Sequence, residues 1–189
     1  MRVIAGTHRG RHLRGPEGSA LRPTSDRVRE ALFSILGNRL PNSRFLDLYA
    51  GTGAVGIEAL SRGASAVTSV ESDGGAVKLL RRNIADCRMA EHMTVRAQTV
   101  KQFLSRPDHW DGPYDIVFAD PPYAAAGELE SLFGDPALAP LFAADSWLIV
   151  EHAEKTTLPA HLGPHAFLRR YLYGDTALSI FSSSGAARP

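Results

Sequence analysis

The 189-residue sequence has a single cysteine, Cys87, so it can form neither an internal disulfide nor a zinc site built on cysteine pairs. No uncharged apolar run approaches the roughly 18–20 residues that span a bilayer. Residues 1–8 lack the apolar segment of a secretory signal. With an apolar content of 44%, we therefore expect a soluble cytoplasmic protein with no membrane partner.

The sequence also has almost no net charge, +1 overall, but that charge is unevenly distributed. Residues 1–44 hold nine arginines against three acidic residues, a net charge of +6, whereas residues 45–189 carry −5. Such asymmetry indicates a polyanionic partner for the basic segment. The alternative is a merely solvated segment, because 18 of the 21 basic residues are arginine and arginine is favoured throughout the chain.

After residue 44, short apolar runs alternate with helical patterns. Strands are predicted at 45–49, 66–71, 93–96, 114–120 and 147–151, and helices at 54–62, 75–87, 100–105 and 129–133. A terminal β-hairpin is predicted over 167–173 and 177–182. This order predicts an α/β, Rossmann-like fold with a mostly parallel seven-stranded sheet, helices on both faces and an antiparallel edge hairpin.

The domain organisation follows from the same pattern. We expect residues 1–22 to form a basic arm with a small β-hairpin, residues 23–183 a single domain, and residues 184–189 a flexible tail. A helix begins near Ser25, and an apolar stripe from Val28 to Leu36 marks its buried face. In this interpretation the arginines of that helix lie on its other faces.

A glycine-rich turn, Gly51-Thr-Gly53-Ala-Val-Gly56, connects the first strand to the next helix. This G-x-G-x-x-G spacing lets the backbone approach a ligand closely. Glu71 ends the second strand, where a carboxylate can accept both hydroxyl hydrogens of a ribose. Together these features indicate an adenosine-containing ligand and leave NAD and S-adenosylmethionine open. No Gly-Lys-Ser/Thr follows the glycines, which excludes a P-loop.

Two further features separate these ligands. Asp47 lies four residues before Gly51, where a carboxylate suits a cofactor with sulfonium and ammonium groups and would repel a pyrophosphate. The tetrapeptide Asp120-Pro121-Pro122-Tyr123 follows the fourth strand. Because ligands of open α/β sheets bind beyond the carboxyl ends of the strands, all these groups are expected at one cleft.

The tetrapeptide has a chemical role in this interpretation. The lone pair of a nucleobase amino group is delocalised into the ring, so the nitrogen is a poor nucleophile. The Asp120 carboxylate and the Pro121 carbonyl can accept its hydrogens and free that lone pair, and Pro122 helps to orient the carbonyl. Tyr123 offers a ring on which an extruded base can stack. The reaction needs no metal, and no metal site is predicted from His161 and His165.

The runs 47–63 and 120–123 resemble class I S-adenosylmethionine-dependent amino-methyltransferases. Arg9-Gly-Arg11 and the run 22–33 narrow the resemblance to the bacterial 16S ribosomal RNA (guanine(966)-N(2))-methyltransferase family, over residues 1–181. The resemblance implies methylation of a guanine N2 amino group in 16S rRNA, within a small-subunit assembly particle. It also implies conversion of S-adenosylmethionine to S-adenosylhomocysteine. We expect a monomer.

The predicted site residues fall into three groups. The catalytic residues are Asp120, Pro121, Pro122 and Tyr123. The cofactor-binding residues are Asp47, Tyr49, Gly51, Thr52, Gly53, Glu71, Ser72, Gln98 and Thr99. The RNA-binding residues are Arg9, Arg11, Arg22, Thr24, Arg27 and Arg29. Members of the family commonly carry an acid after the third strand to hold the adenine amino group, and here we expect the carbonyl of Gln98 to replace it.

Three alternatives remain open from the sequence. A DNA amino-methyltransferase would use the same tetrapeptide on adenine N6 or cytosine N4, although the chain has no obvious separate target-recognition domain. A nicotinamide-dependent oxidoreductase would share the glycine-rich turn. An RNA-binding assembly factor could retain the fold without turnover, although the intact tetrapeptide argues against it.

Overall fold

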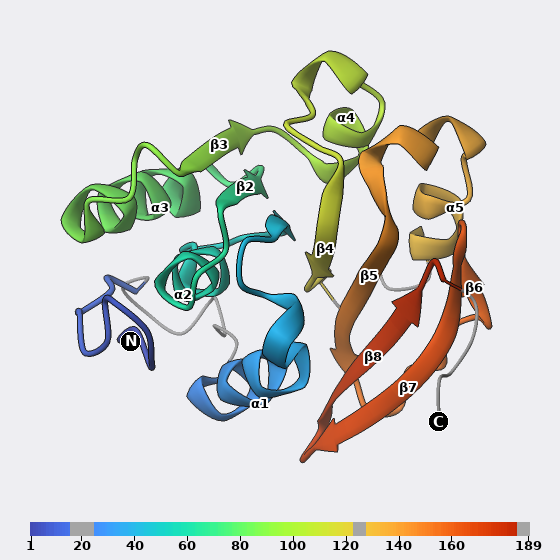
Figure 1. The fold of residues 1–189 in the computed structure, drawn as a ribbon, viewed down its shortest axis with the longest axis horizontal. Helices are drawn as coiled ribbons and strands as arrows, with labels where there is room; N and C mark the ends of the chain where they lie inside the picture. Colours follow the sequence, from blue (N-terminus) through green and yellow to red (C-terminus); the bar gives the residue numbers. More distant parts are fainter. Residues whose placement is uncertain (16–24, 123–127, 185–189) are drawn as a thin grey trace.

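The computed structural model describes residues 1–15, 25–122 and 128–184 of the chain. One eight-stranded sheet runs through them in the order β3-β2-β1-β4-β5-β8-β7-β6 (Figure 1). The strands are β1 (Arg44–Leu48), β2 (Ala66–Glu71), β3 (Met93–Ala97), β4 (Tyr114–Ala119), β5 (Phe142–Ala153), β6 (His161–Leu162), β7 (His165–Tyr173) and β8 (Thr176–Ser182). The first five are parallel, and β5, β8, β7 and β6 pair antiparallel. The predicted α/β fold is confirmed, and the two-residue β6 adds an eighth strand.

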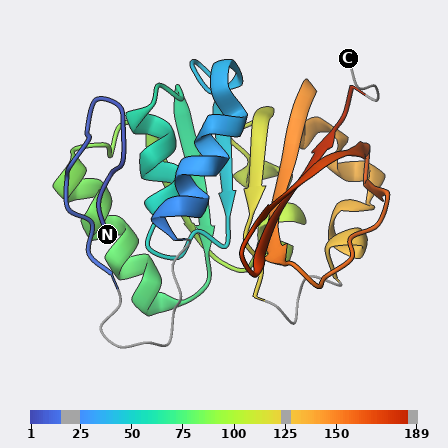
Figure 2. The same ribbon diagram turned by 90° about the horizontal axis from the view of Figure 1, so that it is seen from below.

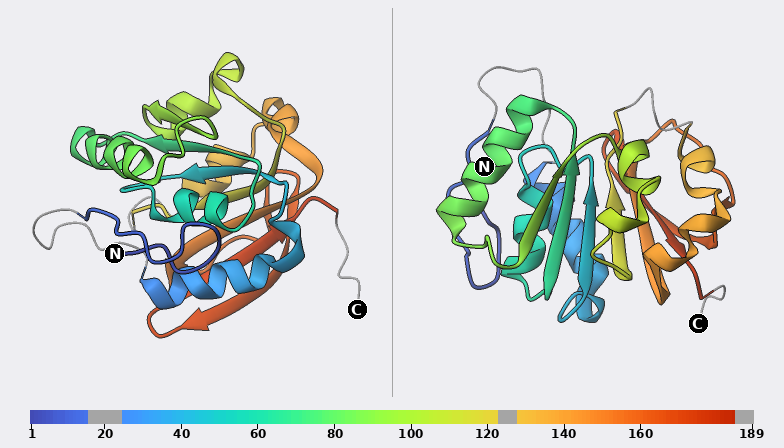
Figure 3. Two further views of the ribbon diagram at one scale, coloured as in Figure 1. Left: turned by 60° about the vertical axis from the view of Figure 1, so that its left-hand side comes forward. Right: turned by 90° about the horizontal axis from the view of Figure 1, so that it is seen from above.

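Helices cover both faces of this sheet (Figure 3). They are α1 (Asp26–Leu36), α2 (Ala54–Ser61), α3 (Gly74–Cys87), α4 (Val100–Leu104) and α5 (Leu129–Phe133). Short 3₁₀ helices lie between a helix and the strand that follows it: η1 (Gly37–Arg39), η2 (Pro107–His109) and η4 (Pro136–Leu141). None of the helices in the described ranges is long and apolar enough to cross a membrane.

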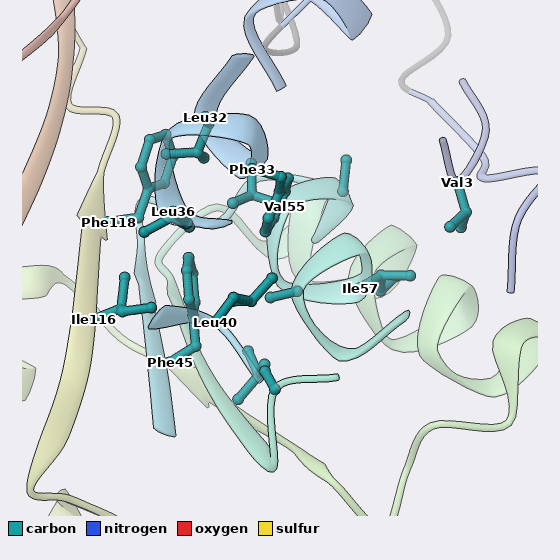
Figure 4. Packing of buried hydrophobic residues seen from close by; sticks show 14 of the residues in the cluster. Val3, Leu32, Phe33, Leu36, Leu40, Phe45, Val55, Ile57, Ile116 and Phe118 are labelled. Carbon is teal, nitrogen blue, oxygen red and sulfur yellow. The ribbon is translucent and has the colours of Figure 1, made fainter. Parts of the chain in front are cut away.

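The side chains of β1 show how the two faces are filled. Phe45 points into the cluster packed under α1, α2 and α3, together with Leu36 and Phe118 (Figure 4). Leu46 and Leu48 point into the second cluster, under α4 and α5. A parallel strand buried on both faces reads as a continuous apolar run. The position of Asp47 within this run therefore puts its carboxylate on the α2 side of the sheet.

Strand β5 is longer than predicted. The sequence predicts residues 147–151, whereas the strand runs from Phe142 to Ala153. Its first half carries polar residues that hide the strand pattern, and one of them, Ser146, is fully buried and hydrogen-bonded to His165 Nε2 at 2.9 Å. The register with β4 also shifts between Tyr114 and Ile116. A hydrogen bond to a distant histidine cannot be read from local periodicity.

The N-terminal arm, residues 1–15, lies against α2 and α3 (Figure 2). Its two limbs are joined by one antiparallel bridge between Arg2 and His12 and by backbone hydrogen bonds such as Val3 N to Arg11 O, 2.9 Å. Val3 and Leu13 are 1% and 3% exposed and belong to the cluster under α1, α2 and α3. The arm is therefore packed into the core of the sheet domain. Residues 185–189 of the expected tail lie outside the described residues.

A buried carboxylate on α2 holds the arm in place. Glu58 is fully buried, and its oxygens accept hydrogen bonds from the amides of Ile4, 2.7 Å, and Ala5, 2.9 Å. The guanidinium of Arg62 pairs with the same carboxylate at 2.6 Å and lies over the ring of Phe33. A buried carboxylate is costly unless it is paired and fully hydrogen-bonded. Here the arm itself supplies two of the donors.

Gly6 provides a test of this packing. Its φ is +83°, and a Cβ at this position would lie 1.8 Å from the carbonyl oxygen of Ser61 on α2. Gly10 has the same φ, with nothing within 4 Å of its Cβ position. We expect Gly10→Ala to cost about 1 kcal/mol from backbone strain alone, and Gly6→Ala to cost at least about 2 kcal/mol more. Urea unfolding of both variants measures this difference, and equal losses would show that the arm does not contribute to the folded core.

Candidate functional site

Three carboxylates meet at the carboxyl ends of the parallel strands. Asp47 lies near the end of β1, Glu71 ends β2, and Asp120 directly follows β4. Strand β1 lies between the other two and pairs with both in parallel. The backbone amide of Asp120 lies 3.5 Å from the carbonyl oxygen of Leu48. The structure therefore brings together the three acids that the sequence analysis assigned to one cleft.

Asp47 is the buried member of this group. Its Oδ2 accepts a hydrogen bond from the backbone amide of Gly56 at 3.0 Å. Burial is the main cause that raises the pKa of Asp47 to about 8; the charges of Asp120 and Glu71 contribute to this rise, and the hydrogen bond from the Gly56 amide opposes it. A positively charged group beside these carboxylates would relieve this repulsion. The site is therefore electrostatically suited to a cation.

Glu71 is oriented by backbone amides. Its Oε2 accepts a hydrogen bond from Gly51 at 2.8 Å, and its Oε1 accepts from Ser72 and Asp73 at 2.7 and 2.8 Å. The carboxylate thus links the end of β2 to the first glycine of the turn. Such a carboxylate is held in one orientation before any ligand arrives, which is the arrangement expected of a ribose-binding acid.

The glycine-rich turn packs tightly on α3. Gly53 precedes α2 with a φ of +78°, and a Cβ there would lie 2.1 Å from Cδ1 of Leu80 on α3. Thr52 is buried. The glycine at position 53 therefore allows the turn to approach α3 closely, in addition to allowing a ligand to approach the backbone.

A pocket of about 220 Å³ lies next to Glu71. Five of the predicted cofactor residues line it: Tyr49, Glu71, Ser72, Gln98 and Thr99. Its other walls are Val70, Val100, Lys101, Glu128 and Leu132, which the sequence analysis did not assign. The backbone at Tyr49 has a φ of +61°, rare for a side chain of this size, and such strain is typical of functional sites.

Sequence signals for the unassigned pocket residues were weak. Val70 and Val100 stand next to assigned positions in the chain, Glu71 and Thr99, and are indistinguishable from ordinary core residues. Glu128 and Leu132 come from the segment around α5, which no motif marks. Only the folded sheet, with α5 on the same face as α4, shows that these residues share a pocket with Glu71.

Gln98 and Thr99 have partners within the protein. The Thr99 hydroxyl accepts from the amide of Gln102 at 3.2 Å and caps α4. Gln98 Oε1 lies 3.1 Å from Nδ1 of His109. Its Nε2 is buried with no hydrogen-bond partner among the described residues. The carbonyl expected to hold an adenine amino group thus already contacts His109, and the unpartnered group is the amide donor, which fits an acceptor nitrogen of an adenine ring.

The catalytic tetrapeptide is described in part. Asp120 is partly exposed, Pro121 is buried and Pro122 is exposed. Tyr123 lies outside the described residues. Within the part of the chain that the structure describes, no group of three or more histidine, cysteine or acidic residues could hold a metal ion.

The predicted RNA-binding residues separate into different environments. Arg9, Arg11 and Arg27 are exposed, and Arg22 and Thr24 lie outside the described residues.

The prediction for Arg29 is wrong, because its side chain is fully buried. Its Nη2 donates to the carbonyl oxygen of Arg2 at 2.6 Å and to Asp26 Oδ1 at 3.0 Å, and burial lowers its pKa. Arg29 stands four residues before Phe33 and seven before Leu36, so it lies on the buried face of α1. It joins the arm to α1 and cannot contact a phosphate.

The strand order, with three acids at or next to the carboxyl ends of β1, β2 and β4, is that of a Rossmann-like class I methyltransferase fold. The structure of "Putative methyltransferase yhhF" from Escherichia coli matches with a TM-score of 0.82 and 34% identity, over 96% of this chain and 97% of that chain. The structure of a hypothetical protein from Thermus thermophilus, TTHA0928, matches with a TM-score of 0.79 and 34% identity, over 95% and 98%.

The chain belongs to the family described as Conserved hypothetical protein 95, which matches residues 1–182. A relative from Bacillus subtilis, "Putative rRNA methyltransferase YlbH", is 31% identical over 98% of this chain and 100% of that protein. Ribosomal RNA small subunit methyltransferase D of Escherichia coli is 40% identical over 65% of this chain and 60% of that protein. These relatives confirm the family resemblance that the arginine-rich and Asp-Pro-Pro-Tyr motifs indicated.

The raised pKa of Asp47 predicts a pH-dependent stability. Because the folded-state pKa lies above the unfolded value, the stabilisation from protonated Asp47 is complete below about pH 4 and is lost as the pH rises through about 8. Asp47→Asn removes this titration. The melting temperature of the variant minus that of the wild type should therefore be higher at pH 9 than at pH 4 by about 5 °C or more. Thermal unfolding across this range tests the prediction, and a constant difference at every pH would contradict it.

Proposed function

We propose that this chain transfers a methyl group from S-adenosylmethionine to the N2 amino group of guanine 966 in 16S rRNA. The observation that carries the proposal is the group of three carboxylates, Asp47, Glu71 and Asp120, beside a glycine-rich turn at one edge of the sheet. The names of the Bacillus subtilis and Escherichia coli relatives support ribosomal RNA as the substrate.

The charges of the site favour this cofactor over a dinucleotide. S-Adenosylmethionine carries ammonium and sulfonium groups, which Asp47 and Asp120 would attract. The pyrophosphate of NAD would be repelled by the same carboxylates, which argues against an oxidoreductase. We assign the ribose to Glu71, because three backbone amides hold the orientation of its carboxylate. We assign the adenine to the wall of the pocket at Gln98.

In this proposal the reaction is a direct displacement. S-Adenosylmethionine supplies an electrophilic methyl group and leaves as S-adenosylhomocysteine. The Asp120 carboxylate and the Pro121 carbonyl accept the hydrogens of the guanine amino group, which localises the lone pair on N2. One proton must leave N2 as the new N–C bond forms, and Asp120 is its proposed acceptor. Tyr123 is proposed to stack on the extruded base.

The N-terminal arm supplies the proposed RNA contacts. Arg9 and Arg11 are exposed on the arm and Arg27 is exposed on α1. Arg22 and Thr24 are proposed as further RNA contacts. Residues 1–22 would form this surface and residues 23–183 the methyltransferase domain, acting as a monomer on a small-subunit assembly particle in the cytoplasm. Because the arm is packed on α2 and α3, the phosphates would meet a preformed surface.

The proposed chemistry is tested at Asp120. Asp120→Ala should lower methyl transfer about 10²- to 10³-fold, because it removes an acceptor for the amino group. S-Adenosylhomocysteine binding, measured by calorimetry, should be largely retained. Asp145→Ala is the matched control. Asp145 is an exposed acid in the first half of β5, whereas Asp120 follows the carboxyl end of the neighbouring parallel strand β4, so this variant should keep full activity. Full activity of Asp120→Ala would contradict the mechanism.

Substrate identity is tested by mass-spectrometric mapping of methylated nucleotides. Small-subunit particles, naked rRNA and duplex DNA are compared side by side, with and without the enzyme. We expect one new methyl group, on N2 of guanine 966, with the particle as the best substrate. Methylation of adenine or cytosine in the DNA would instead support the DNA amino-methyltransferase alternative.

The RNA surface is tested with two neighbouring arginines. Arg27→Ala should leave the unfolding free energy unchanged and reduce the slope of log K against log salt by about 0.7 to 0.9, the loss of one phosphate contact. Arg29→Ala should destabilise the fold by about 2 kcal/mol or more, because it removes a buried guanidinium that holds Arg2 and Asp26. An unchanged salt slope for Arg27→Ala would remove that residue from the RNA surface.

A further inference from the structure

One buried amide on α3 touches both the arm and the glycine-rich turn. Asn83 is 0% exposed and lies on the face of α3 that also carries Leu80 and Cys87. Its Oδ1 accepts a hydrogen bond from the amide of Arg14 at 2.8 Å. Its Nδ2 donates to the carbonyl oxygen of Arg14 at 3.1 Å and to that of Thr52 at 2.9 Å. The two amide hydrogens are therefore divided between two segments far apart in the sequence.

The contact on the turn reaches the cofactor-binding backbone directly. Thr52 stands between Gly51, whose amide donates to Glu71, and Gly53, which precedes α2. Leu80, one helical turn before Asn83, packs against Gly53. A change in the backbone at Thr52 would therefore alter the hydrogen bond that Asn83 makes there.

The contact on the arm is made by Arg14. The backbone of Arg14 is hydrogen-bonded to the side chain of Asn83, and the Nε of Arg14 pairs with Asp86 Oδ2 at 3.1 Å. The side chain of Arg11, a proposed RNA-binding residue, donates to the backbone carbonyl of Asp86 at 2.8 Å. The bonds between Asn83 and the backbone of Arg14 are partly buried, whereas the side-chain pair of Arg14 and Asp86 is about half exposed and contributes little. Asn83 is therefore the stronger of the two attachments.

We propose that Asn83 is a positioning residue that couples the RNA-binding arm to the cofactor-binding turn. The inference rests on the proposed function, since it assigns the two contacts to RNA and to S-adenosylmethionine. A cofactor that orders the turn at Thr52 also orders Asn83, and Asn83 then holds Arg14 more firmly. Because coupling between two sites is reciprocal, RNA bound to the arm strengthens cofactor binding by the same factor.

If the residue at position 83 only had to fill space in the core, a leucine would be sufficient. The side-chain amide of Asn83 instead uses its oxygen and its hydrogens in hydrogen bonds. It bonds both backbone groups of Arg14 on the arm and the backbone carbonyl of Thr52 on the turn. A buried amide is stabilising only when these partners stay in place. Displacement of either segment leaves a buried polar group unpaired, so the two segments have correlated positions.

The coupling is measured first on the unaltered protein. Amide hydrogen exchange of Arg14 is followed with and without S-adenosylhomocysteine, and Thr7, whose amide donates to Ser61 on α2, is the reference. We expect the ligand to slow exchange at Arg14 at least about fivefold and to leave Thr7 unchanged. An unchanged rate at Arg14, or equal slowing at both amides, overturns the coupling while the ligand still binds. Absence of any ligand binding overturns the proposed function itself.

Two variants then separate positioning from simple stabilisation. Asn83→Ala should weaken binding of S-adenosylhomocysteine about tenfold and abolish the response of Arg14 exchange to the ligand. Asp86→Ala, one helical turn away, removes the side-chain pair with Arg14 and should keep both properties. A variant Asn83→Ala that is less stable but still shows the full exchange response has only a structural role, and the proposal fails. Should this variant not fold, the exchange measurement on the unaltered protein still decides the question.

Discussion

The hydrogen bond from the Gly56 amide to the buried carboxylate of Asp47 is the interaction on which the site depends. It joins the end of β1 to the first turn of α2 and so sets the path of the glycine-rich turn between them. A side chain at Gly56 would lie 3.1 Å from that carboxylate and 2.8 Å from Met93, which leaves no room for one. The carboxylate is unfavourably placed by itself, because burial and two nearby acids raise its pKa. The proposed cationic cofactor would offset that cost when it binds.

Buried polar side chains perform a second task by attaching the arm. Glu58 on α2 accepts from two arm amides, Asn83 on α3 bonds both backbone groups of Arg14, and Arg29 on α1 donates to the carbonyl of Arg2. Each of these bonds is made to the backbone of the arm, and the side chains of Val3 and Leu13 add apolar packing. The side chain of Arg9 stays exposed, whereas those of Arg11 and Arg14 also bond to Asp86 on α3.

The sequence predicted most of the fold and much of the cleft. Apolar runs such as 116–119 and the glycine-rich turn are local signals, and parallel strands bring their carboxyl ends together by topology, so Asp47, Glu71 and Asp120 could be assigned to one place. Arg29 was misassigned because its charge was weighed above its position, four residues before Phe33. The partners of Asn83 lie 31 and 69 residues away. Contacts of that range depend on the packing of α3, which no local pattern encodes.

In the folded protein, not all of the arginines that make residues 1–44 basic are free of contacts within the domain. Arg29 is buried and Arg14 pairs with Asp86. Other arginines of residues 1–44 donate to backbone carbonyl oxygens of the domain: Arg11, Arg39 and Arg44. Arg9, Arg11 and Arg27 remain exposed among the described residues. The acids of the sheet domain that matter for the proposed chemistry lie at or near the carboxyl ends of β1, β2 and β4. In the proposed function the two charge excesses therefore serve different ligands: RNA at the basic surface, and the cationic cofactor beside the acids at the strand ends.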